Sequence, residues 1–185
     1  MRKQRMETFT FSLIGGRGME HEHSNWYVVQ TGTGDETKIY KISRSEFGAI
    51  YLPLKEVLQK RFGGFVKKQW PLFPGYLFVK GDIHRFLDTI RHGDLDVSVK
   101  PLGALGRPKP VKSEEMELIF KLAENGVVGI SKGSMGKDGK MHILDGPMKG
   151  MEGEIQFIDK RRKKAKVQFD LFERKIDVTL ALEIV

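Results

Sequence analysis

WYVVQTGTG, residues 26–34, combines aromatic and β-branched side chains with two closely spaced glycines. Such side chains favour a strand, and glycine favours the turn that follows it. We therefore expect a strand that begins at Trp26 and ends in a turn at residues 31–34. Asp35 is placed to cap a short helix through Lys41 or beyond, in which Ile39 and Ile42 lie on one face.

Two further apolar runs, residues 49–54 and 65–80, are predicted to contain strands. Gly63 and Gly64 suit a hairpin turn, because glycine accepts the positive φ angles that such turns need. The second run carries Pro74 and Gly75, and proline in a sheet is confined to strand starts, edges and bulges. We therefore expect an exposed sheet edge at this point.

The clearest helix begins at its cap, Asp82, and ends at Gly93. Its apolar positions have helical spacing and are Ile83, Phe86, Leu87 and Ile90. A third helix begins at Ser113. Its predicted buried positions are Met116, Ile119, Phe120 and Ala123. The element order β-α-β-β-α-(β)-α predicts an α+β fold with a ferredoxin-like split βαβ arrangement, in which helices cover one sheet.

The chain divides by composition into four parts. Residues 1–24 show no sustained periodicity and are expected to be a flexible tail, in which Met19 is a candidate for the true start. Residues 25–125 hold the ferredoxin-like domain. Residues 126–140 are rich in glycine, serine and lysine, which predicts a linker. Residues 141–185 read as short alternating strands, enough for a small β-barrel.

The charge balance favours a polyanionic partner. The 185 residues carry 32 Lys and Arg against 24 Asp and Glu, a net charge of +8. The absence of cysteine excludes disulfides and cysteine-type zinc sites. No apolar run approaches the ~20 residues that span a bilayer. We expect a soluble cytoplasmic protein with no membrane partner.

No motif indicates catalysis. Thr37 stands where a dinucleotide-binding fingerprint after residue 32 would need its third glycine. Ser131 and Asp138 stand where a P-loop would need its first glycine and its magnesium-binding hydroxyl. The histidines lack a paired helical spacing, and there is no nucleophile elbow. The sequence therefore predicts no enzyme, no cofactor and no metal site.

The strongest charge cluster is the run KRRKKAK at residues 160–166, which we place on a β-turn. Its cations are Lys160, Arg161, Arg162, Lys163, Lys164 and Lys166. A solvated hairpin tip is the plain alternative. Like charges that converge on one turn repel each other, and phosphates would offset that repulsion, so we favour RNA.

The strand after this run alternates between two faces. Val167, Phe169 and Leu171 are the predicted core face, which leaves Phe172 outside as a weak signal of a protein interface. Phosphate contacts position an RNA without reading its sequence. The candidates for base contacts on neighbouring strands are Gln168, Arg174 and Lys175.

Three segments together resemble the NusG family: NWYVVQTG at 25–32, LFPGYLFV at 72–79, and the carboxyl-terminal segment. In the last, GPMKGMEGEI at 146–155, Ile158-Asp159, Ala165-Lys166-Val167 and Leu171-Phe172 resemble a KOW motif. Glu173 stands where the family pattern often has glycine. The resemblance spans residues 26–185 and implies an NGN domain followed by an SH3-like KOW β-barrel.

The resemblance implies a monomeric transcription elongation factor without a cofactor, whose NGN domain binds RNA polymerase. Phe73, Pro74, Gly75 and Tyr76 match the polymerase-facing motif, and Phe172 matches the partner surface of the KOW domain. The basic turn is similar to the antitermination paralog group LoaP, which implies binding of nascent RNA, with a leader hairpin as the expected target. Two alternatives stay open: a housekeeping NusG that binds Rho or NusE, and a ribosome-associated RNA-binding module.

Overall fold

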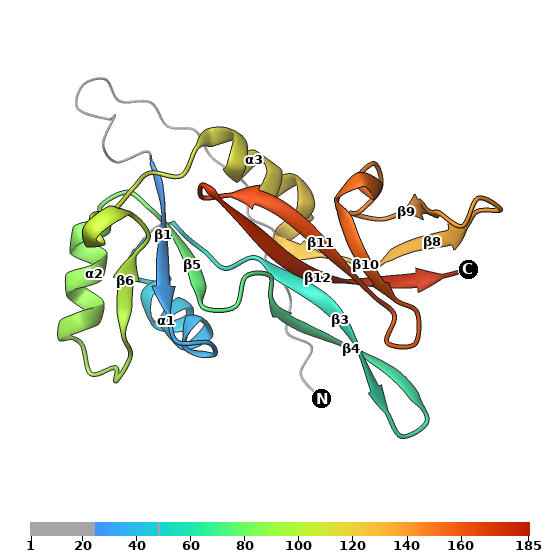
Figure 1. Cartoon of the computed structure of the whole chain (residues 1–185). Coiled ribbons are helices and arrows are strands. Elements are labelled where there is room, and N and C mark those ends of the chain that lie inside the picture. The colour runs from blue at the N-terminus through green and yellow to red at the C-terminus, as the bar shows by residue number, and fades with distance from the viewer. Residues whose placement is uncertain (1–24, 48) are drawn as a thin grey trace.

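A computed structural model describes residues 25–47 and 49–185 (Figure 1). The predicted tail at residues 1–24, with the candidate start at Met19, lies outside the described residues. Helices and several sheets are mixed along the chain, as the predicted α+β class requires.

The amino-terminal sheet has the order β2-β5-β1-β6, and all its pairings are antiparallel. Its strands are β1 (Trp26–Thr31), β2 (Ile50–Tyr51), β5 (Tyr76–Lys80) and β6 (Val99–Pro101). Side chains alternate between its faces, so Val29 and Leu77 pack with the first two helices. Val28 and Phe78 belong to a second core on the opposite face. Both faces of the sheet are therefore covered.

The first two helices are α1 (Asp35–Ser43) and α2 (Ile83–His92). The side chain of Asp82 accepts a hydrogen bond from the Arg85 N–H at 2.9 Å, which confirms the predicted cap of α2. All four predicted apolar positions of α2 are buried. In α1 two expectations are wrong: Gly34 occupies the cap position instead of Asp35, and Ile42 is exposed while Ile39 is buried.

A long hairpin joins β3 (Leu54–Arg61) to β4 (Gly64–Pro71), and β7 (Val127–Val128) extends it to the sheet β4-β3-β7. Gly63 has φ 91°, which confirms the predicted glycine turn. The hairpin leads away from the amino-terminal sheet toward the carboxyl-terminal strands (Figure 1).

The carboxyl-terminal sheet is a half-barrel with the order β10-β11-β12-β8-β9. Its strands are β8 (Ser131–Met135), β9 (Met141–Asp145), β10 (Ile155–Asp159), β11 (Lys164–Leu171) and β12 (Arg174–Ile184). Short 3-10 helices are η1 (Ala104–Gly106), η2 (Glu124–Gly126) and η3 (Glu152–Glu154). The stretch 126–140, predicted as a linker, instead holds β7 and β8, each paired with another strand.

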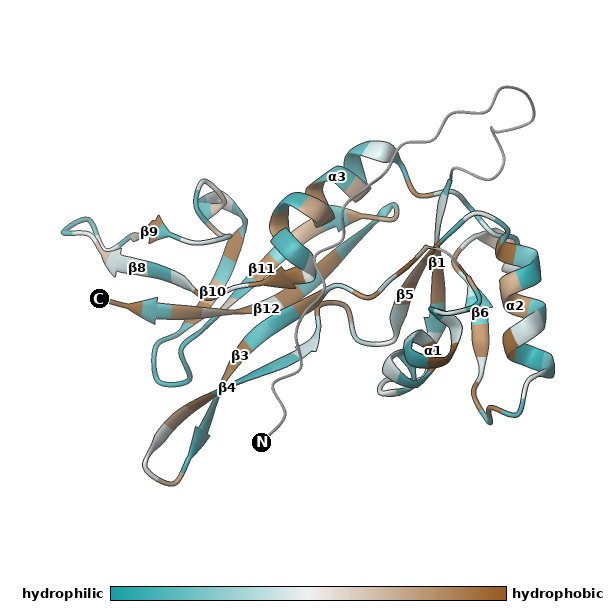
Figure 2. Ribbon diagram, turned by 180° about the vertical axis from the view of Figure 1, so that it is seen from behind, coloured by the Kyte–Doolittle hydropathy of each residue, from teal (hydrophilic) through white to brown (hydrophobic). Residues whose placement is uncertain are grey.

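The amino-terminal sheet with α1 and α2 forms one half of the molecule, and the carboxyl-terminal sheet forms the other. Helix α3 (Ser113–Leu122) lies between these two halves (Figure 1). Met116 and Ile119 are buried as predicted, in one cluster with Phe78 of β5 and Phe169 of β11. Phe120 is partly exposed, contrary to the prediction, with its ring 5.8 Å from that of Trp26. Figure 2 shows hydrophobic residues on α3 and β11 where the two elements lie together. The two halves therefore share one core.

Candidate functional site

The basic turn, residues 160–164, connects β10 to β11, as the sequence predicts. Asp159 Oδ1 accepts a hydrogen bond of 2.8 Å from the backbone N–H of Arg162, and Lys163 has φ 53°. These features hold the chain in a tight reversal. The reversal brings five cationic side chains to one corner of the molecule, which creates a positive potential suited to an anion.

Few of these cations are neutralised. Arg162 Nε lies 3.8 Å from Asp159 Oδ2, and Lys163 Nζ lies 3.5 Å from Glu183 Oε1. Lys160, Arg161 and Lys164 have no ion pair with any residue that the structure describes. These three charges are therefore available to an external anion.

A half-buried lysine adds to the charge near the basic turn. Burial, and to a lesser extent the nearby charge of Lys164, lowers the pKa of Lys55 on β3 to about 8. Lys55 on β3 and Lys164 at the start of β11 are therefore close enough for their positive charges to repel each other.

The β3–β4 hairpin meets the basic turn directly. Lys163 Nζ lies 5.1 Å from the centre of the Phe65 ring, within the range of a cation–π contact. No function of this hairpin is predicted from the sequence. Its sequence does carry a sign of anion binding, since four cations flank the glycine turn: Lys60, Arg61, Lys67 and Lys68. Only the fold shows that the hairpin approaches residues 160–164.

The remaining predicted RNA contacts are dispersed. Lys166 pairs with Asp177 at 2.6 Å, and Gln168 donates a hydrogen bond of 3.0 Å to the same carboxylate. Arg174 and Lys175 begin β12, at the far end of β11, roughly 23 Å from the basic turn at the usual strand rise. Arg174 and Lys175 therefore cannot join the basic turn in one contact surface, because the basic turn precedes β11 and these two residues follow it.

Phe172 is not left outside, contrary to the prediction. It lies in the two-residue turn between β11 and β12, with φ 56°, and it is partly buried. Its ring stacks on Tyr76 at 6.5 Å and lies 6.4 Å from Phe73 and 5.9 Å from Phe78. The turn, rather than the strand alternation, directs this side chain into the other half of the molecule.

That contact covers Phe73 and part of Tyr76, whereas Pro74 between them is exposed. Phe73 is only 3% exposed, and Tyr76 begins β5, which lies between β1 and β2 inside its sheet. The expected exposed edge is therefore absent. Pro74 is tolerated because it lies in the turn before β5, where Gly75 has φ 81°.

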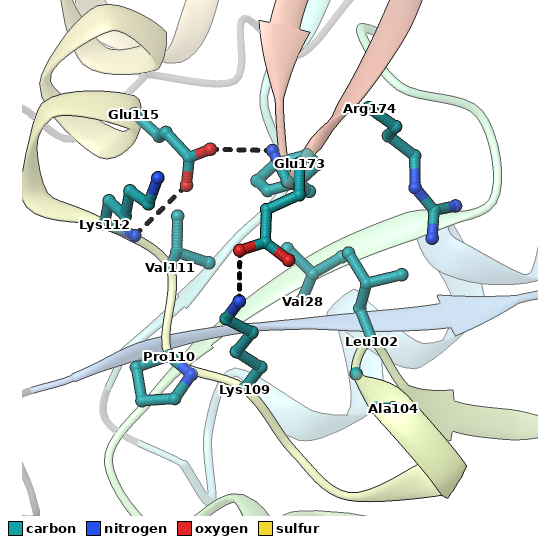
Figure 3. Close-up of a pocket in the computed structure, with 12 residues that line it drawn as sticks. Val28, Leu102, Ala104, Lys109, Pro110, Val111, Lys112, Glu115, Glu173 and Arg174 are labelled. Carbon is teal, nitrogen blue, oxygen red and sulfur yellow. Dashed lines mark hydrogen bonds and ion pairs between the residues drawn. The ribbon is translucent and has the colours of Figure 1, made fainter.

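We call the contact of Phe172 and Glu173 with the amino-terminal half the seam. Polar contacts also hold this seam together. Glu115 Oε1 accepts a hydrogen bond of 2.7 Å from the Phe172 N–H, and its Oε2 accepts one of 3.1 Å from the Lys112 N–H. Lys109 forms an ion pair with Glu173, and this lysine lowers the pKa of the Glu173 carboxyl (Figure 3). These residues and Val28 of β1 line a cavity of about 330 Å³.

The basic turn offers positive charge, and the contacts of Phe172 offer aromatic surface. Among residues 25–47 and 49–185 there is no cluster of three or more His, Asp or Glu side chains able to hold a metal ion. No helix in the same ranges has the length and apolar character needed to cross a membrane. The basic turn suits phosphates, and the aromatic seam suits a protein surface.

Comparison with known proteins gives one consistent result. A family model described as transcription termination factor nusG matches residues 24–120. Three similar relatives are named transcription termination/antitermination protein NusG. The Buchnera aphidicola protein is 27% identical over 175 residues, covering 87% of this chain and 94% of its own length. Those of Xylella fastidiosa and Vibrio cholerae are each 26% identical, covering 84% and 87% of this chain and 94% of their own lengths.

Proposed function

Because this chain belongs to the NusG family, we propose that it is a transcription elongation and processive antitermination factor of the LoaP type. In this proposal residues 25–125 are an NGN domain that binds RNA polymerase. The carboxyl-terminal sheet is an SH3-like KOW domain that binds nascent RNA, with a leader hairpin as its target. The linked domains would raise the effective concentration of RNA at the polymerase.

The polymerase contact is assigned to Phe73, Pro74, Gly75 and Tyr76. In the described arrangement Phe73 and Tyr76 lie against Phe172, the proposed partner residue of the KOW domain. Each proposed protein surface therefore covers the other. Polymerase binding would require the turn at Phe172 to move away, which couples activity to separation of the two halves.

The observation that supports RNA binding best is the basic turn with its three unpaired cations. Surface cations are often paired with carboxylates or spread over the surface. A turn that is only solvated has no need to gather several cations at one place. Lys160, Arg161 and Lys164 gather at one corner without a carboxylate partner among the described residues. Phosphates would supply the missing negative charge.

The proposal is tested with the triple variant Lys160→Ala, Arg161→Ala, Lys164→Ala in filter binding to a stem-loop RNA and a scrambled RNA at two salt concentrations. Each lost phosphate contact lowers the log–log salt slope by roughly 0.7–0.9, so we expect weaker binding and a slope reduced by between about two and three. The matched control removes three exposed cations on or beside α1 and α2, away from the basic turn (Figure 1). They are Lys41, Arg44 and Arg91.

Equal affinity of the triple variant and the unmodified chain for both RNAs would show that the basic turn is merely solvated. The proposed RNA function would then be abandoned in favour of a general NusG role, with Rho or NusE bound through Phe172.

A further inference from the structure

A cleft of about 620 Å³ lies between the β3–β4 hairpin and the basic turn. Its volume is within the roughly 300–1,000 Å³ typical of binding pockets. The hairpin contributes Leu58, Lys60 and Phe65 to its wall, and the turn side contributes Arg161 and Lys164. The two segments are about a hundred residues apart in sequence and lie side by side in both views (Figures 1 and 2).

An accessible aromatic ring lines the cleft. Phe65 is 36% exposed, and its register partner on β3 is Lys60, so the two side chains share one face of the hairpin. An aromatic ring next to a cation is the arrangement with which proteins hold single-stranded nucleic acids, since bases stack on the ring while cations follow the backbone.

The charges of the cleft are largely uncompensated. Asp159 is the acidic residue of its wall, and it already accepts the Arg162 N–H and lies 3.8 Å from the Arg162 guanidinium. Lys60, Arg161 and Lys164 have no ion pair within the described part of the chain. Lys164 also repels Lys55, and an anion in the cleft would relieve that repulsion.

We propose that this cleft binds an unpaired RNA segment, with one base stacked on Phe65 and the adjoining phosphates held by Lys60 and Arg161. A duplex would offer its phosphates to the cations but would keep its bases stacked inside, leaving Phe65 unused. The inference rests on the proposed RNA function and deepens it, because it makes the first domain part of the RNA site.

The test measures binding of the complete chain to a fluorescein-labelled oligouridine by fluorescence anisotropy. Loss of one base–aromatic stack predicts that Phe65→Ala weakens binding about fivefold or more, with an unchanged salt slope. Phe65→Trp retains a stacking surface and should bind at least as tightly as the unmodified chain. Lys60→Gln should lower the log–log salt slope by about 0.7.

Two matched controls separate the cleft from the hairpin in general. Phe62 is a fully exposed ring at the hairpin tip and does not line the cleft, so Phe62→Ala should bind as the unmodified chain does. Lys68 lies on the opposite face of β4 from Phe65 by strand alternation, so Lys68→Gln should leave the salt slope nearly unchanged.

Unchanged affinity of Phe65→Ala, together with a loss of binding in the triple variant of the basic turn, would overturn this inference and keep the proposed function. Loss of binding in Phe65→Ala that Phe65→Trp fails to restore would also overturn it, since packing rather than stacking would then explain the effect.

Tighter binding of an oligothymidine DNA of the same length would overturn the assignment to RNA. Tighter binding of an RNA duplex of that length would overturn the assignment to unpaired bases.

Discussion

The turn at Phe172 and Glu173 shows how single residues determine the relation between the two halves. Both residues have positive φ, 56° and 59°, in a two-residue hairpin turn where asparagine and glycine are usual. A non-glycine residue in the left-handed region costs roughly 1–2 kcal/mol. The turn persists because its N–H bonds Glu115, its ring packs on Tyr76, and Lys109 pairs with Glu173.

We expect Glu173→Gly to be more stable to unfolding than Glu173→Ala. Both variants lose the ion pair with Lys109, but only glycine relieves the backbone at φ 59°. Urea denaturation of the two variants measures the difference, and the unmodified chain serves as reference. A more stable alanine variant would show that this turn is unstrained.

Lys55 predicts a pH dependence of stability. Its pKa is about 8 in the folded chain against an ordinary 10.5, so between these values the unfolded chain binds more protons and stability rises with pH. At neutral pH the charged, half-buried lysine destabilises the fold. Lys55→Met should therefore be more stable than the unmodified chain at neutral pH.

That advantage should shrink as the pH rises from about 8 through 10.5, above which Lys55 is neutral in both states. Urea denaturation of both proteins across this range measures the difference, in which the titration of other lysines and tyrosines cancels. Lys68→Met, which removes an exposed charge, is the control. A constant advantage of Lys55→Met across the range would contradict the prediction.

At the scale of elements, the sequence predicts the helices and strands that are stabilised by neighbouring residues, and it misses those that depend on distant partners. Helix α2 could be read from its sequence because its cap, its apolar spacing and its final glycine all lie within twelve residues, 82–93. Strand β8 could not, because SKGSM has the composition of a linker. Its conformation is set by parallel pairing with residues 182–184 and by Ser131 Oγ, which accepts the Met148 N–H at 3.0 Å.

The same contrast between local and long-range contacts applies to the candidate site. The basic turn is a local cluster of charge and was predicted at its observed place between two strands. The cover over Phe73 and the approach of Phe65 to Lys163 join residues far apart in sequence, and nothing local encodes them. Strand alternation even misdirected the prediction for Phe172, because a turn residue no longer obeys the period of two.

The pairing of β8 predicts which fragment folds alone. Residues 129–185 contain every strand of the carboxyl-terminal sheet and should show a cooperative thermal transition. Residues 140–185 lack β8, which joins β12 to β9, and should show none, although the sequence alone favours a domain beginning at 141. Circular dichroism melts of the two fragments measure this. A cooperative melt of the shorter fragment would show that β8 is dispensable.

At the scale of the whole molecule, one core joins the two halves through α3, and the same seam covers Phe73 and part of Tyr76. A partner that needs these residues binds only the fraction of molecules in which the seam is open. Its apparent dissociation constant is therefore larger than the intrinsic one by the inverse of that fraction. Weakening the seam should tighten binding without any new contact.

We therefore expect Phe172→Ala to bind core RNA polymerase more tightly than the unmodified chain, provided that Phe73 and Tyr76 contact the polymerase as proposed. The ring of Phe172 touches three aromatic side chains across the seam, and its removal favours the open arrangement. If the lost packing is worth about 1.4 kcal/mol, the affinity rises by about tenfold. Titration of labelled chain with core polymerase measures it.

Phe157→Ala is the matched control, because Phe157 is 62% exposed on β10 and has no ring contact across the seam. Hydrogen exchange of residues 73–78 adds an independent readout, since an open seam should lower their protection in Phe172→Ala alone. Lower protection with unchanged polymerase affinity would show that the seam opens but covers no polymerase site. Unchanged protection would show that the two halves stay together without this ring, held by α3 and the shared core.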